Sequence, residues 1–112
     1  MVHNRNKLID LFIGNISNSI VHKILEKAID NEEIVSRYEK ELLNSWEIAK
    51  KYREKINPKT KLPEKDIEYV KDKIIKKVRK ELVLRISKGY ENIDLNLIEK
   101  LVDESLEKME II

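Results

Sequence analysis

Apolar residues recur along residues 8–29 at a spacing that predicts one largely buried helix. The segment reads LIDLFIGNISNSIVHKILEKAI and contains the longest charge-free run of the chain, from Leu11 to Val21. Apolar side chains four residues apart fall on one face of a helix, and further apolar residues here widen that face. Because a helix that is apolar around most of its circumference is buried, we expect the other segments to pack around this one.

Gly14 leaves open whether this helix is continuous. A glycine in a helix interior costs about 1 kcal/mol relative to alanine. The residues that follow it are of the type that caps helix N-termini. Two interpretations therefore stand: one helix that begins at a cap formed by Asn4 or Asn6, or two shorter helices separated near Gly14.

Three further amphipathic segments predict three more helices. The first, over residues 30–56, starts at Asp30 or Asn31, and its apolar and aromatic residues alternate in steps of three and four. A loop that contains Pro58 separates it from the second, over residues 63–89. Pro63 suits the first turn of this helix, and Gly89 suits its C-terminal end. The last helix begins after Asp94, a good N-cap.

These elements predict an all-α fold, an antiparallel helical bundle of four helices, or of five if Gly14 breaks the first. We expect residues 1–112 to form a single helical domain. Two glycines and two prolines leave little room for the turns of a sandwich or barrel. Because helices of this length are long for a monomer of this size, we expect a homodimer that associates through the first two helices.

Composition narrows the class of protein further. The chain has no cysteine, which excludes disulfides, thiolate metal sites and cysteine nucleophiles. This is compatible with a reducing cytoplasm, where we place the protein. No charge-free run approaches the roughly 20 residues of a membrane span, so we expect no membrane partner. Charged residues make up 39% of the chain. The heavy use of lysine and glutamate fits a heat-adapted source, although nine asparagines favour AT-rich codon bias instead.

Charge is unevenly distributed over the second half of the chain. Residues 71–88 carry eight Lys or Arg against two acids, and residues 91–110 carry seven acids against two lysines. Four lysines fall on one side of the third helix and could contact phosphates of RNA or DNA: Lys73, Lys76, Lys77 and Lys80. Two alternatives are a solvated helix face and a contact with the acidic last helix of another subunit.

Small and aromatic residues on the first two helices are candidates for an interface. Gly14 and Ser17 would let another helix approach closely, within the chain or between subunits. Tyr38, Trp46 and Tyr52 lie along the second helix, where aromatic side chains belong to a core or an interface more often than to a ligand cage.

A polar strip on the first helix is the remaining candidate for chemistry. Asn15, Asn18, His22 and Glu26 share one face, and His22 and Glu26 at i,i+4 could offer two ligands to a metal. No third ligand is indicated, so we interpret the strip as the solvated side of the helix. We predict no catalytic residues, no bound metal and no cofactor.

Two segments resemble parts of known families. SRYEKELLNSWEIAKKYREKINP, residues 36–58, is similar to the helical hairpin of an archaeal ribonuclease P subunit that continues into a zinc ribbon, although no cysteine follows here. KTKLPEKDI, residues 59–67, is similar to the junction before the last helix of histone folds. Both resemblances imply nucleic-acid binding, and neither identifies a functional residue.

From these patterns we predict a non-catalytic helical protein, a protein–protein interaction or scaffold module of unknown partner. The alternative is a small nucleic-acid-binding protein that uses the basic face of the third helix. An enzyme is not expected, because no recognisable catalytic motif is present in the sequence.

Overall fold

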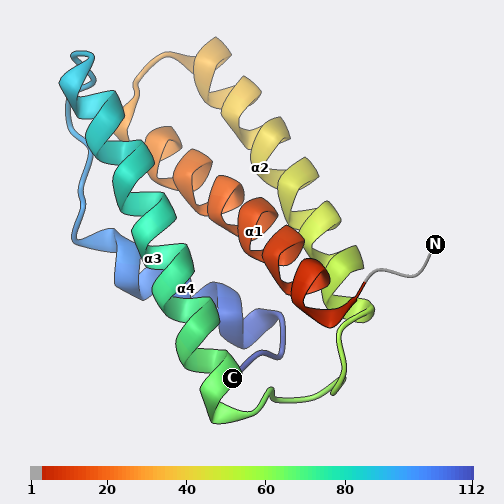
Figure 1. The fold of residues 1–112 in the computed structure, drawn as a ribbon. Coiled ribbons are helices and arrows are strands. Elements are labelled where there is room, and N and C mark those ends of the chain that lie inside the picture. Colours follow the sequence, from red (N-terminus) through yellow and green to blue (C-terminus); the bar gives the residue numbers. More distant parts are fainter. Residues whose placement is uncertain (1–3) are drawn as a thin grey trace.

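The computed structural model describes residues 4–112, which form four helices joined by short connections (Figure 1). The described part of the chain measures 40 × 23 × 23 Å. The helices are α1 (Arg5–Ala28), α2 (Glu32–Glu54), α3 (Glu64–Ser87) and α4 (Leu97–Lys108). The predicted all-α fold of four packed helices is confirmed.

Helix α1 is continuous, and Gly14 does not break it. The side chain of Asn4 accepts a hydrogen bond from the backbone N–H of Lys7 at 2.8 Å, so Asn4 and not Asn6 is the N-cap. A Cβ atom added at Gly14 would meet nothing within 4 Å. Within the described chain, therefore, no other helix makes the predicted close approach at Gly14.

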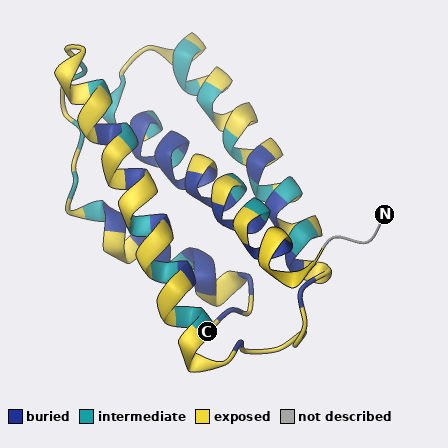
Figure 2. Ribbon diagram, viewed as in Figure 1, coloured by how far each residue is buried: buried dark blue, intermediate teal, exposed yellow. Residues whose placement is uncertain are grey.

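Helix α1 is the centre of the fold. Twelve of its 24 residues are buried, against three of the 23 residues of α2, and Figure 2 shows the dark blue of buried residues concentrated on α1. Helices α2, α3 and α4 all lie against α1, and α3 also packs against α4. The backbone of α2 approaches that of α1 but not that of α3 or α4. The bundle is therefore incomplete on the side where α2 and α4 face each other.

Local hydrogen bonds and backbone conformation set the ends of the helices, which differ from the predicted limits. Asn31 caps α2, because its side chain accepts hydrogen bonds from two backbone N–H groups of the first turn. Gly89 follows α3 with a φ of 100°, a left-handed conformation that glycine adopts without strain. Helix α4 begins three residues beyond Asp94, because the Asp94 carboxylate accepts from the N–H of Asn96 in a turn that precedes the helix.

The two ends of the bundle differ in how far their side chains are buried and hydrogen-bonded. At one end the N–H of Leu62 donates to the carbonyl of Ile111 at 3.0 Å, and Ile111 is fully buried. We call this the closed end: Arg53, residues 56–62 and residues 109–111. At the other end, α3 finishes with three exposed aliphatic side chains, and we call these the open end: Val83, Leu84 and Ile86.

Candidate functional site

Arg53 on α2 is buried and bonds only to main-chain carbonyls. Its side chain is surrounded by the connection that follows α2 and by the turn that follows α4. A guanidinium has five N–H donors, and here all five are used. Nε donates to Met109 O at 2.8 Å, Nη1 to Ile56 O and Pro58 O at 3.0 and 3.1 Å, and Nη2 to Thr60 O and Glu110 O at 2.8 and 2.9 Å.

These acceptors satisfy Arg53 without neutralising it. Burial lowers the pKa of the Arg53 guanidinium, and the nearby Glu110 carboxylate opposes that shift. None of the five hydrogen-bond acceptors is a carboxylate, so the charge of the guanidinium is not cancelled by a direct ion pair. Arg53 therefore ties three segments together and leaves positive charge at the closed end.

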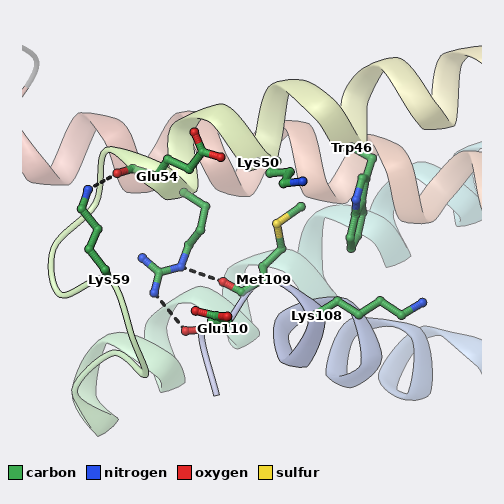
Figure 3. Close-up of a pocket in the computed structure, with 8 residues that line it drawn as sticks. Trp46, Lys50, Glu54, Lys59, Lys108, Met109 and Glu110 are labelled. Atoms are coloured by element: carbon green, nitrogen blue, oxygen red, sulfur yellow. Dashed lines mark hydrogen bonds between the residues drawn. The ribbon is translucent and has the colours of Figure 1, made fainter.

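A cleft of about 500 Å³ opens beside Arg53. Figure 3 shows its lining residues, with Trp46 and Lys50 extending from α2 and Lys108 from the end of α4. Lys59 enters from the connection after α2, where its ammonium group contacts the main-chain oxygen of Glu54. The cleft is lined by one aromatic ring, Met109 and several charged side chains: Trp46, Lys50, Arg53, Glu54, Lys59, Lys108, Met109 and Glu110.

A second hollow of about 180 Å³ adjoins the first and shares Trp46 and Lys108 with it. Its walls are more aliphatic and include Ile20, Leu42 and Leu43. Leu43 is 54% exposed, the largest exposed fraction among the large hydrophobic residues that the structure describes. We call the two hollows together the α2–α4 groove. It exists because the backbones of α2 and α4 do not approach each other.

The four lysines predicted on the third helix are all exposed on α3. Lys76 forms an ion pair with Asp72 at 3.0 Å, and the ammonium of Lys73 lies 5.8 Å from the centre of the Tyr69 ring. Another lysine of the helix, Lys71, pairs with Asp103 of α4 at 2.8 Å. Among the described residues, one ion pair thus joins the basic and acidic helices. Nucleic-acid binding by the four lysines stays a prediction.

The five residues predicted for an interface do not form one surface. Gly14 is exposed and Ser17 is buried, with no hydrogen-bond partner for its hydroxyl among the described residues. Tyr38, Trp46 and Tyr52 are each half-buried against the core of their own chain. Of these five, only Trp46 lines the α2–α4 groove.

The prediction that the polar strip of α1 is solvated is wrong for His22. The imidazole is buried beneath α2, with Nδ1 2.8 Å from Asn18 O and Nε2 2.5 Å from a carboxylate oxygen of Glu41. The rings of His22 and Tyr38 pack edge to face, with their centroids 5.4 Å apart. This part of the strip faces α2, since the amide of Asn18 also donates to the Ser45 hydroxyl at 2.6 Å. Within residues 4–112 no three His, Asp or Glu side chains converge as a metal site would require.

Comparisons with known proteins add no function. No protein-family model, no curated protein and no solved structure matches the chain. The two local resemblances noted in the sequence receive no support from these comparisons. In the part of the chain that the structure describes, no helix combines the length and apolar character that crossing a membrane requires.

Proposed function

We propose that the protein is a non-catalytic protein–protein interaction module that docks a partner at its open end. One observation carries this proposal. Six large hydrophobic side chains are exposed among the described residues, and three of them, at 41–48% exposure, lie within four positions at the end of α3: Val83, Leu84 and Ile86. Exposed apolar side chains scattered singly are ordinary, whereas a cluster marks an interaction surface.

The charges around the open end indicate the chemistry of the partner. Arg79, Lys80 and Lys88 are exposed on the same part of the chain. We expect the partner to be a protein with an apolar hollow bordered by carboxylates, because complementary charges speed encounter and fix orientation. A second copy docking by the same patch would bring like charges together, which disfavours self-association at this end.

Site-specific photo-crosslinking tests this proposal. A benzophenone amino acid at Leu84 should give a discrete adduct with an acidic protein in an extract of the native cells. The matched control places the same group at Tyr69, an aromatic residue of α3 that is also exposed. The adduct should form from position 84, not from 69, and should disappear when Arg79 and Lys80 are changed to Glu. Equal adducts from both positions, or none from position 84, would contradict the proposal.

Nucleic-acid binding by α3 is a second candidate function. It is favoured by the exposure of its lysines, since Lys73, Lys77 and Lys80 form no ion pair within the described chain. Four phosphate contacts give a slope of about −3.6 for log affinity against log salt on duplex DNA. Fluorescence anisotropy with labelled duplex DNA should show such a slope, and changing all four lysines to Glu should abolish binding. No binding by the native chain at low salt would exclude this candidate.

Self-association also remains our proposal. Helix α1 is mostly covered within its own chain, but most of α2 is uncovered and carries the exposed Leu43, which also lines the smaller hollow of the groove. Sedimentation equilibrium should then give twice the 13.3 kDa chain mass. Changing Leu43 to Arg should return the mass to that of one chain. A single-chain mass for the native protein at every concentration would contradict self-association.

A further inference from the structure

We propose that the larger hollow of the α2–α4 groove binds a nucleoside phosphate, free or within a single strand of nucleic acid. In this arrangement the base lies against Trp46, and the phosphate is held by Lys50 and Lys108. The site includes no residue of the open end and none of the four lysines on α3. It is therefore independent of docking at the open end and of nucleic-acid binding by α3.

Trp46 provides the surface for the base. One part of this side chain packs against the core, and another part lines both hollows of the groove. Bases stack on aromatic side chains with little regard for sequence, because every base has a flat π-face. A cleft of about 500 Å³ lies within the range that small-molecule sites occupy. Trp46 is thus placed as a platform with room for a ligand beside it.

The charges of the cleft favour an anion. Four cations, Arg53 and three lysines, line it together with two carboxylates, Glu54 and Glu110. Arg53 has no free N–H to offer a ligand, because all five donors already bond to carbonyls. Its charge still acts on the cleft, since those acceptors are neutral. Lys50 and Lys108, which are exposed, can therefore supply the phosphate contacts against a background of excess positive charge.

A nucleoside phosphate fits this pair of features better than an acidic peptide. A peptide carboxylate would use the lysines but would leave the indole without a stacking partner. The four lysines of α3 offer charge without a comparable platform, because the nearby Tyr69 hydroxyl donates to Asp10 at 3.2 Å and its ring lies beside Lys73. Among the described basic surfaces, the cleft combines cations with an aromatic wall that is open to a ligand.

Trp46 fluorescence tests the proposal directly, because the chain contains a single tryptophan. The intact protein is titrated at low salt with AMP, with an eight-residue oligoadenylate and with inorganic phosphate. AMP should quench the emission in a saturable way, and phosphate alone should not. A gain of about tenfold or more in affinity for the oligoadenylate would identify a single strand as the source, whereas equal affinity would identify the free nucleotide; both support the proposal.

Matched variants separate the cleft from the rest of the basic surface. Lys50→Gln combined with Lys108→Gln should weaken AMP binding about tenfold or more, because both lysines line the cleft. Lys73→Gln combined with Lys77→Gln removes the same number of charges from α3 and should leave binding unchanged. All four lysines are exposed, so both double variants keep the fold, which circular dichroism verifies.

Three results would overturn the proposal. The first is the absence of saturable quenching by any nucleoside phosphate. The second is an equal loss of AMP affinity in the two double-lysine variants, which would indicate general charge attraction. The third is equally strong quenching by an octaglutamate peptide, which would identify the cleft as a peptide site.

Discussion

The closed end and the open end of the bundle use their side chains in opposite ways. At the closed end, a buried arginine uses all its donors on main-chain carbonyls, and Ile111 is fully buried. Arg5 adds a hydrogen bond to Asn57 O at 2.9 Å and an ion pair with Asp66 at 2.7 Å. At the open end, Val83, Leu84 and Ile86 remain in contact with water.

This difference separates stability from binding. Polar groups satisfied inside the fold are costly to disturb, because removing one partner leaves others buried and unsatisfied. Exposed aliphatic groups contribute little to folding and are free to be buried against a partner. We therefore expect the free energy of unfolding to depend on the closed end and docking to depend on the open end.

The largest expected effect is the loss of the Arg53 side chain. Arg53→Met should reduce the free energy of unfolding by about 3 kcal/mol or more, because five carbonyls lose a charged donor. Urea denaturation followed by circular dichroism measures this change. Arg53→Lys, which keeps the charge but has only three donors, should fall between the native protein and Arg53→Met. A loss below about 1 kcal/mol for Arg53→Met would break the comparison between the ends.

The next effect separates two adjacent isoleucines at the closed end. Ile111→Ala should cost about 2–4 kcal/mol, because Ile111 is fully buried and its truncation leaves a cavity. Ile112 is 42% exposed, so Ile112→Ala should cost less than about 0.5 kcal/mol. The same urea measurement applies to both variants. Equal losses would show that the C-terminal turn is not docked as the structure has it.

Gly14→Ala should raise stability by about 0.5–1 kcal/mol. Alanine loses less backbone freedom than glycine on forming a helix, and a methyl group at this position meets open space. Because Gly14 belongs to neither end, this variant should raise the thermal midpoint without changing the difference between Ile111→Ala and Ile112→Ala. A loss of stability would mean that another chain lies close to Gly14.

At the open end, stability should be nearly insensitive to substitution. Leu84→Ser should change the free energy of unfolding by less than about 0.5 kcal/mol, because its side chain is already half exposed. Leu82, two positions earlier on the same helix, is fully buried, and Leu82→Ala should cost about 2–5 kcal/mol. A large loss for Leu84→Ser would show that the open end belongs to the core.

The smallest expected effect concerns the ion pair between Lys71 of α3 and Asp103 of α4, which belongs to neither end. The Asp103 carboxylate, 2.8 Å from the Lys71 ammonium, raises the pKa of that ammonium. Its contribution is complete below the pKa of the unfolded chain and is lost as pH rises through the raised folded value. Asp103→Asn should therefore reduce stability by a few tenths of a kcal/mol at neutral pH, and by less once the pH exceeds the raised pKa of Lys71. A pH-independent difference would rule out this linkage.

Local pattern was enough to predict the four helices and some of their caps. Burial of half of α1 outweighs the local cost of Gly14, but that balance depends on neighbours that the sequence does not place. The burial of His22 likewise depends on which side of α1 is covered by α2. In both cases the missing information was the arrangement of helices, not their existence.

The candidate cleft was beyond prediction for the same reason. The lysines of α3 follow one another on one helix, so their shared face is readable from spacing alone. Lys50, Lys59 and Lys108 come from three separate segments and line one cleft only after folding. Arg53 gave no signal, because its acceptors are main-chain carbonyls and two of them lie 56 and 57 residues further along the chain.

Because Met109 and Glu110 lie 56 and 57 residues after Arg53, their bonds to Arg53 form late during synthesis of the chain. Helices α1 and α2 are adjacent in sequence and pack side by side, so they can associate while the later residues are still being added. Arg53 must remain hydrated during this stage, because Met109 and Glu110, whose carbonyls accept two of its hydrogen bonds, have not yet been synthesised. We expect the removal of water from this guanidinium to be among the last steps of maturation, completed when residues 109 and 110 reach the nascent hairpin.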